Sequence, residues 1–396
     1  MGQTASNTGT WMQKVAQDLL ALELSHGNGT VLGITTALQF LPLLVLGPYG
    51  GVLVDRHSTR RILLVSQAVM AVLALIPALL VATRTARLDH LYLLALALGL
   101  TMAVEKPALQ AYIAESVAPG QLVSALAFNS AVLNLARVAG PALAGPLIVV
   151  LGPAPAFLAN TVSYLVVIGC LLRMDPDVGR PAPAVARAKQ QVREGLRYVR
   201  DHRDVALTLV LVAIVAAFGM NFQITTALMI SHVYQAPTSL FGLGNTALAV
   251  GSVIGSILAA RRPRTARQQL AAAAFAFGTL ETVCALMPGC VSFLVLLVPT
   301  GTALLIFLTA AKAHLQLGVA DGIRGRIMSL YLLATLGTTP LVAPLIGWIA
   351  QAAGPRTALA LGGVVSAVAA VTIGLLPPRP AAVPATSAPA ATAVQA

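Results

Sequence analysis

The sequence predicts an all-α membrane protein with twelve transmembrane helices arranged as two pseudo-symmetric six-helix bundles. Three observations support this prediction. Of the 396 residues, 57% are hydrophobic and only 10% are charged, and long runs rich in Ala, Leu and Val alternate with short polar connectors. Soluble domains carry about 25% charged residues. This chain has too few charges to cover a surface in water, so lipid is its expected solvent.

A helix that spans a bilayer needs roughly 20 apolar residues. Only helices and closed barrels satisfy their backbone groups in lipid. The apolar runs are continuous and do not alternate as barrel strands do, which favours helices. Turn residues such as His26–Gly29 separate the runs. We expect helices at residues 8–25, 31–54, 62–83, 91–115, 122–150, 154–173, 204–230, 238–260, 269–288, 291–315, 323–350 and 356–377.

The distribution of positive charge predicts the topology. The net charge is +12, and 25 Lys and Arg residues are present. Eighteen of them fall on the connectors and tail of one side, three on the connectors of the other side, and four inside helices. Because Lys and Arg accumulate in cytoplasmic loops, both termini are expected in the cytoplasm. The same scattered pattern argues against nucleic acid as a partner.

Six helices, a basic connector and six further helices suggest an internal duplication. The connector spaces Val192, Leu196 and Val199 on one helical face, which is typical of a helix on the membrane surface. A regulatory role for this helix is the alternative. The Pro- and Ala-rich end of the chain is expected to be disordered. The predicted organisation is an N-terminal bundle at 1–173, a cytoplasmic linker at 174–203, a C-terminal bundle at 204–377 and a cytoplasmic tail at 378–396.

Several short motifs follow one another along the chain. The most specific is Gly50–Arg61, GGVLVDRHSTRR, between the second and third helices. It resembles the signature loop Gly-x-Leu-Ala-Asp-Arg of the major facilitator superfamily. The ordered set is similar to the bacterial drug and siderophore exporters of that superfamily, in particular the enterobactin-exporter type. Its further members are residues 9–13, 17–18, 134–137 with 140–141, 218–223 and 324–329.

This resemblance implies the major facilitator fold and a secondary active transporter. Such a protein would export a small amphipathic molecule (a drug, siderophore or secondary metabolite) by proton antiport with alternating access. It would act as a monomer in the bacterial plasma (inner) membrane, with the substrate, protons and the lipid bilayer as partners. No ATP-binding loop of the form G-x-x-x-x-G-K-[ST] occurs, and we expect neither a cofactor nor an enzymatic activity. Two alternatives are an uptake symporter or facilitator on the same fold, and a non-transporting scaffold or sensor.

Two regions depart from the family pattern. The chain opens with a polar stretch, Gly2–Thr8, so the first helix is expected to be short. The fourth helix reads Glu105-Lys106-Pro107-Ala108-Leu109-Gln110, where the family usually has Asp-Ala-Pro-Ala-Arg-Gln. Leu109 therefore replaces an arginine, and Lys106 supplies a positive charge one turn earlier on the same helical face. These changes bear on which substrates are accepted.

Ionisable residues inside a membrane are costly and are candidates for function. Lys14 and Asp18 are four residues apart and share a helical face, so they form either a structural ion pair or a proton site. Glu105 is a second proton-coupling candidate or a fixed partner of Arg137, which would clamp neighbouring helices. Glu281 is interpreted as a packing or interfacial residue. The resemblance implies a cavity lined by helices one, four, seven and ten, and the candidate set is Lys14, Gln17, Asp18, Glu105, Lys106, Gln110, Asn134, Arg137, Asn221, Gln223 and Lys312.

The signature loop is also a candidate gate. Asp55 at the end of the second helix is placed to meet the positive N-terminus of the eleventh helix, near Ile323–Arg326. A solvated loop with no gating role is the alternative. The candidate latch comprises Gly51, Asp55, Arg56, Arg60, Arg61, Arg324 and Arg326. The three cysteines have no spacing typical of a metal or redox site, and no metal is expected.

Overall fold

The computed structural model describes residues 2–174, 188–237, 239–260, 267–319 and 321–376, and these residues form helices joined by short turns. The prediction of an all-α fold is confirmed. Residues 175–187 of the predicted linker and the predicted tail at 378–396 lie outside the described residues.

The N-terminal half, a name used here for α1–α6, follows the predicted order of helices. Its first helix is longer than expected, because the polar stretch at the start of the chain is helical from Gly2. Ser6 and Gly9 are buried there, so packing against the other helices of this half compensates for the polar sequence. The elements are α1 (Gly2–Leu24), α2 (Gly29–Arg56), α3 (Thr59–Ala82), α4 (Leu88–Glu115), η1 (Pro119–Gln121), α5 (Leu122–Leu151) and α6 (Ala154–Arg173).

The linker contains the helix α7 (Ala188–Asp201), and the C-terminal half comprises α8 to α14. One predicted helix, at 204–230, is interrupted: two π-helical segments, η2 and η3, flank a short α-helix. The elements of this half are α8 (Arg203–Ile214), η2 (Val215–Gly219), α9 (Phe222–Leu228), η3 (Met229–Val233), α10 (Ser239–Ala260), α11 (Arg267–Leu286), α12 (Cys290–Leu317), α13 (Asp321–Ala353) and α14 (Pro355–Leu375).

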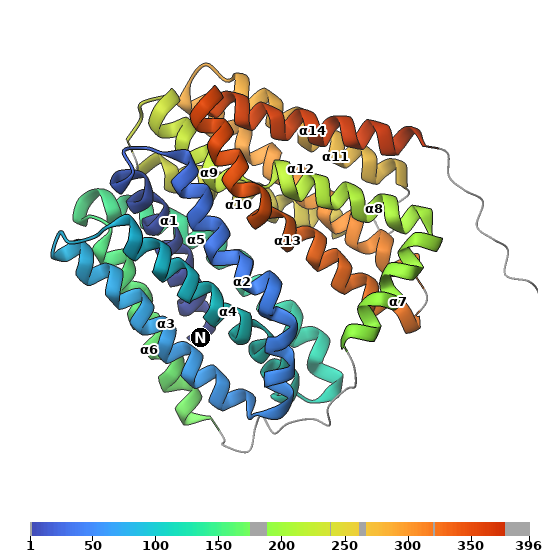
Figure 1. Ribbon diagram of the computed structural model, residues 1–396, viewed down its shortest axis with the longest axis horizontal. Coiled ribbons are helices and arrows are strands. Elements are labelled where there is room, and N and C mark those ends of the chain that lie inside the picture. Colours follow the sequence, from blue (N-terminus) through green and yellow to red (C-terminus); the bar gives the residue numbers. More distant parts are fainter. Residues whose placement is uncertain (1, 175–187, 238, 261–266, 320, 377–396) are drawn as a thin grey trace, which may run out of the picture.

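The two halves lie side by side, with α1–α6 on one side and α8–α14 on the other (Figure 1). Within the N-terminal half, α1 packs against α5 and α6, and α3 packs against α4 and α6. Within the C-terminal half, α12 packs against α10 and α11, and α11 packs against α14. The most extensive contacts between the halves are those of α2 with α13 and of α5 with α10.

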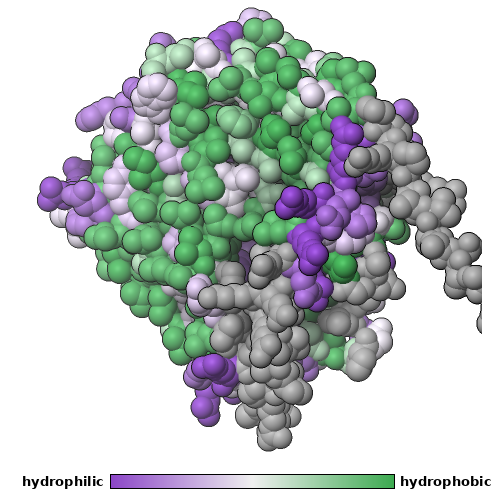
Figure 2. All heavy atoms as spheres, turned by 45° about the vertical axis from the view of Figure 1, so that its right-hand side comes forward, coloured by the Kyte–Doolittle hydropathy of each residue, from purple (hydrophilic) through white to green (hydrophobic). Residues whose placement is uncertain are grey.

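The outer surface is apolar. Figure 2 shows a face covered mainly by hydrophobic side chains, with hydrophilic residues gathered toward its edges. Large side chains such as Val150, Leu93 and Trp348 are exposed. Eleven helical segments of the described chain are long and apolar enough to cross a membrane. The long helix α1 is not among them, because Lys14, Asp18 and several amides lower its hydropathy.

Candidate functional site

The first charged pair lies inside α1. Lys14 Nζ is 2.9 Å from Asp18 Oδ1, and the two residues are only 6% and 1% exposed. The spacing of four residues stacks them on one face of the helix, as the sequence predicted. Each charge is stabilised mainly by the other, so the loss of either one leaves a buried unpaired ion.

Polar side chains next to this pair extend toward the interior of the N-terminal half. Asn160 Nδ2 on α6 donates a hydrogen bond to Gln13 Oε1 at 2.6 Å, and Ser163 Oγ donates to Asn160 Oδ1 at 2.9 Å. Gln17 is buried, and its Nε2 has no hydrogen-bond partner in the described structure. Gln17 also lines a small cavity of about 10 Å³ beside Leu98 and other apolar residues of α3, α4 and α6. It therefore points into its own bundle.

The second charged pair lies on α4. Lys106 Nζ is 3.2 Å from Glu105 Oε2, although adjacent residues on a helix point about 100° apart. The flexible lysine side chain bends back far enough to reach the carboxylate. The contact is an ion pair without hydrogen-bond geometry, so Glu105 Oε2 has no hydrogen-bond partner among the described atoms. Glu105 is buried, whereas 44% of the Lys106 side chain is exposed. Gln110, one turn further along α4, is exposed.

Among the described residues, Arg137 forms no ion pair with a carboxylate. The Arg137 guanidinium carbon lies 5.1 Å from the ring centroid of Trp11, in a cation–π contact between α5 and α1. Glu105, which the sequence offered either as a partner of Arg137 or as a proton-coupling group, is paired with Lys106. Arg137 thus joins two helices through an aromatic face. The side chain of Asn134 lies outside the described residues.

The candidates of the C-terminal half are separate from these pairs. Asn221 is buried at the end of the η2 segment, where its Nδ2 donates to Ala217 O at 2.7 Å and its Oδ1 has no partner among the described atoms. Gln223 is half-buried and Lys312 is exposed. Within the described part of the chain, no hydrogen bond or ion pair joins these three residues to the pairs on α1 and α4.

The described residues of the predicted latch have other partners. Arg60 donates to the carbonyl oxygens of Leu171 (2.8 Å), Leu172 and Met174 at the end of α6. Arg326 Nη1 lies 2.5 Å from Glu194 Oε2 on α7. A separate hydrogen bond joins Arg324 Nε to Gln316 O at 2.9 Å, and Arg56 and Arg61 are exposed. The side chain of Asp55 and the surroundings of Gly51 lie outside what the structure describes, so the contact of Asp55 with α13 stays a prediction.

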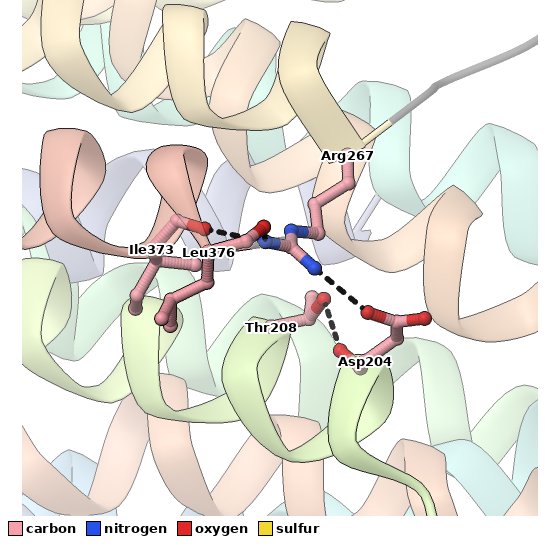
Figure 3. Close-up of polar contacts among 5 residues, drawn as sticks. All are labelled: Asp204, Thr208, Arg267, Ile373 and Leu376. Atoms are coloured by element: carbon pink, nitrogen blue, oxygen red, sulfur yellow. Dashed lines mark hydrogen bonds and ion pairs between the residues drawn. The ribbon is translucent and has the colours of Figure 1, made fainter. Parts of the chain in front are cut away.

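Arg267 has a structural role that the sequence reasoning counted only as a positive charge of the inner side. Its Nη1 donates to Asp204 Oδ1 on α8 at 2.9 Å (Figure 3). Its Nη2 donates to the carbonyl oxygens of Ile373 (2.8 Å) and Leu376 at the end of α14. A cation at the C-terminal end of a helix complements the helix dipole. Its position at the start of the third long helix of its half matches that of Arg60, and this correspondence is the sequence signal that could have predicted the role.

The two halves are in close contact at the end that carries the α1–α2 turn. Gly29 N donates to Gln351 Oε1 of α13 at 3.2 Å. A Cβ atom on Gly33 would lie 2.4 Å from Ala343 O of α13, and one on Gly242 of α10 would lie 2.5 Å from Pro141 O of α5. Only glycine allows these backbones to approach so closely. This end of the molecule, defined by Gly29, Gly33 and Gly242, is called the closed end below.

A larger cavity of about 420 Å³ lies inside the N-terminal half, at the end opposite the closed end. Its wall is mainly apolar and includes Leu109, Phe128 and Val167. Among the described residues, no three His, Cys, Asp or Glu side chains are arranged to hold a metal ion.

Comparisons with known proteins match this architecture. The family model for transmembrane secretion effectors matches residues 1–392. The staphyloferrin A transporter of Staphylococcus aureus (strain NCTC 8325 / PS 47) is 23% identical over 251 residues, which are 63% of this chain and 63% of that protein. The MFS-type transporter YfiS of Bacillus subtilis (strain 168) is 25% identical over 266 residues, 66% of this chain and 62% of that protein. The chain therefore spans less than two thirds of the length of these curated relatives.

The solved structures show the fold. The crystal structure of a D-xylose–proton symporter aligns with a TM-score of 0.75 at 13% identity, covering 94% of this chain and 95% of that one. The predicted major facilitator fold is confirmed by this likeness together with the family match. The protein therefore belongs to the transmembrane secretion effector family of the major facilitator superfamily and is a multi-pass membrane protein.

Proposed function

We propose that the protein exports a small amphipathic molecule from the bacterial cell in exchange for protons. The observation that carries this proposal is the buried ion pair Lys14–Asp18, at 2.9 Å, within the first long helix of the bundle. Charges at membrane depth are expensive and are retained where they bind or move something. The description of the family as secretion effectors supports the outward direction.

The pair provides a simple means of exchange. While Asp18 is ionised, its carboxylate holds Lys14 Nζ. The ionised carboxylate can also accept hydrogen bonds from a donor group in the polar head of the substrate. A proton on Asp18 removes that negative charge, so the substrate group loses its acceptor and is released. Loss of the proton on the other side of the membrane restores the carboxylate. Proton and substrate therefore compete for one group, as antiport requires.

The second pair supports the same substrate class. The Lys106 side chain is 44% exposed and keeps Glu105 as its counter-ion. A cationic surface of this kind favours anionic or polar-headed molecules. The relative named as a staphyloferrin A transporter supports a siderophore among the substrates, and a drug or a secondary metabolite fits the same description. We also propose that the protein is an exporter of the enterobactin-exporter type.

The closed end supports a mechanism of alternating access. Both termini are proposed to lie in the cytoplasm, which places the closed end outward, and we assign the structure to a state open toward the cytoplasm. The latch residues Gly51, Asp55, Arg56, Arg60, Arg61, Arg324 and Arg326 lie at the opposite end. We infer that they come together, through Asp55 and the N-terminus of α13, when that end closes.

Transport by inside-out vesicles tests this proposal. Vesicles that contain the protein are acidified by respiration, and the entry of staphyloferrin A or ethidium is measured with and without a protonophore. We expect protonophore-sensitive entry, which corresponds to export from the cell. Asp18→Asn should abolish it. The matched control Asp89→Asn changes an exposed carboxylate on the first turn of α4 and should not. Unchanged transport by Asp18→Asn would remove Asp18 from the mechanism, and substrate movement out of the vesicles would establish uptake instead.

A further inference from the structure

Glu281 is a buried carboxyl group that the proposed exchange mechanism does not use. It lies on α11, between the η2 segment and α14, and is 2% exposed. The sequence suggested a packing or interfacial residue, but an interfacial position would leave the carboxyl group in contact with headgroups or water. The structure instead encloses it within the C-terminal half.

Two glycines make room for the carboxyl group. A Cβ atom on Gly219 of η2 would lie 3.0 Å from Glu281 Oε2 and 3.0 Å from Ser366 Oγ of α14. A Cβ atom on Gly362 of α14 would lie 2.8 Å from Glu281 Oε1 and 2.6 Å from Phe218 O. Both carboxyl oxygens therefore border spaces that a larger residue would fill, and a second oxygen atom borders each of these spaces.

Among the residues that the structure describes, no positive charge compensates this group. Glu281 Oε2 and Ser366 Oγ have no hydrogen-bond partner in the described structure. The titratable neighbour of Glu281 is Cys284, which lies one turn along α11 and is hydrogen-bonded to Thr300 of α12. The faces of η2 and α14 contribute Ser366 and backbone groups, and no described Lys, Arg or His forms an ion pair with Glu281. An ionised carboxylate in such surroundings would cost far more than a neutral one.

The group also faces the interruption in the seventh membrane helix. The chain leaves the η2 segment at Gly219 and resumes α-helix at Phe222. π-Helical turns of this kind are rare and often mark functional sites. Unwound segments of membrane helices expose carbonyl groups that bind protons or cations. The carbonyl oxygen of Phe218 lies at this interruption, and it borders the same Gly362 Cβ position as Glu281 Oε1.

We propose that Glu281 is a second proton-binding site, neutral in this conformation, which releases its proton when the interrupted helix moves away from α11 and α14. A proton fits better than Na⁺, since the space beside Oε2 is also bounded by Phe277 Cε1, 2.6 Å from the Gly219 Cβ position. That leaves no room for the several oxygen ligands that a metal cation requires. The site is independent of Asp18 and does not rest on the direction or substrate of transport.

Infrared spectroscopy of the full-length protein in nanodiscs tests this proposal. The carbonyl stretch of protonated carboxyl groups is recorded while the pH is raised. We expect a band that persists at neutral pH, disappears in the alkaline range, and is lost entirely in Glu281→Gln. The matched control Glu23→Gln replaces an exposed carboxylate of α1 and should leave the band unchanged. Asp18→Asn should also leave it unchanged, so this site and the exchange mechanism can fail separately.

Two results would overturn the proposal. One is a neutral-pH band that survives in Glu281→Gln. The other is a wild-type band that changes when Na⁺ replaces choline at constant pH, which would indicate a sodium site. If Glu281→Gln does not yield folded protein, Glu281→Asp takes its place. That variant should show the band at a shifted frequency and lose it at a different alkaline pH, whereas an unaltered band and titration would refute the assignment.

Discussion

The two halves of the molecule treat buried charge differently. In the N-terminal half, Asp18 and Glu105 each have a lysine partner on the same helix. In the C-terminal half, Glu281 is equally buried and forms no ion pair with a described cation, but it lies against a helix that is interrupted. A paired carboxylate can remain ionised, whereas an unpaired one is stable only with a proton. The difference suggests that the halves hold protons by separate means.

The halves also share one structural feature. Arg60 at the start of α3 binds the carbonyl groups at the end of α6, and Arg267 at the start of α11 binds those at the end of α14. In each half the third long helix thereby holds the end of the sixth. The agreement supports the internal duplication that the order of helices suggested, even though residue identity between the halves is weak.

The largest loss of stability is expected from Lys14→Ala. This variant leaves Asp18 without its cation, and Glu281 in the other half likewise has no ion pair among the described residues. Removing one partner of a buried ion pair costs about 3–5 kcal/mol, because the other charge is left uncompensated. Lys14→Ala should therefore lower the thermal stability of the purified protein strongly. The double variant Lys14→Ala with Asp18→Asn removes both charges and should recover most of the loss. A double variant as unstable as the single one would show that the lysine acts by packing alone.

A smaller loss of stability is expected when Arg60 or Arg267 is replaced. Comparing the two variants tests whether these arginines play the same role in the two halves. Hydrogen bonds from a charged group contribute about 1.5–3 kcal/mol to the free energy of unfolding. Arg267 also forms an ion pair with Asp204. Arg267→Ala and Arg60→Ala should each reduce stability by a comparable amount in a thermal unfolding assay. Lysine at either position should restore little of the loss, because it lacks the planar fork of donors. A large effect in one half and none in the other would contradict the proposed equivalence.

The smallest effect concerns the contact between the halves. A methyl group at Gly33 meets Ala343 O at 2.4 Å and should force α2 and α13 apart, at a cost of about 1–3 kcal/mol. Gly33→Ala should therefore open the closed end and increase the labelling of a cysteine introduced there by a membrane-impermeant reagent. Gly47→Ala lies on the same helix, where an added Cβ has no neighbour within 4 Å, and serves as the control. Equal labelling of both variants would show that the closed end does not depend on this contact.

Most of the fold could be predicted from the chain alone. Apolar runs of membrane length, turn residues and the asymmetry of Lys and Arg predicted the helices to within a few residues, because lipid imposes length and hydrophobicity on each helix separately. The pair Lys14–Asp18 followed from the spacing of four residues, since a helix alone brings those side chains together. These features depend on neighbours in the sequence.

Other features were decided by contacts between distant segments. The helical start at Gly2, the contact of Arg137 with Trp11 and the hydrogen bonds of Arg60 and Arg267 each need a partner from another helix. The same holds for Glu281, whose enclosure between Gly219 and Gly362 depends on how three helices meet. A residue's own neighbours in the chain determine whether it lies in a membrane helix, but only the packing of the helices determines whether its charge has a partner.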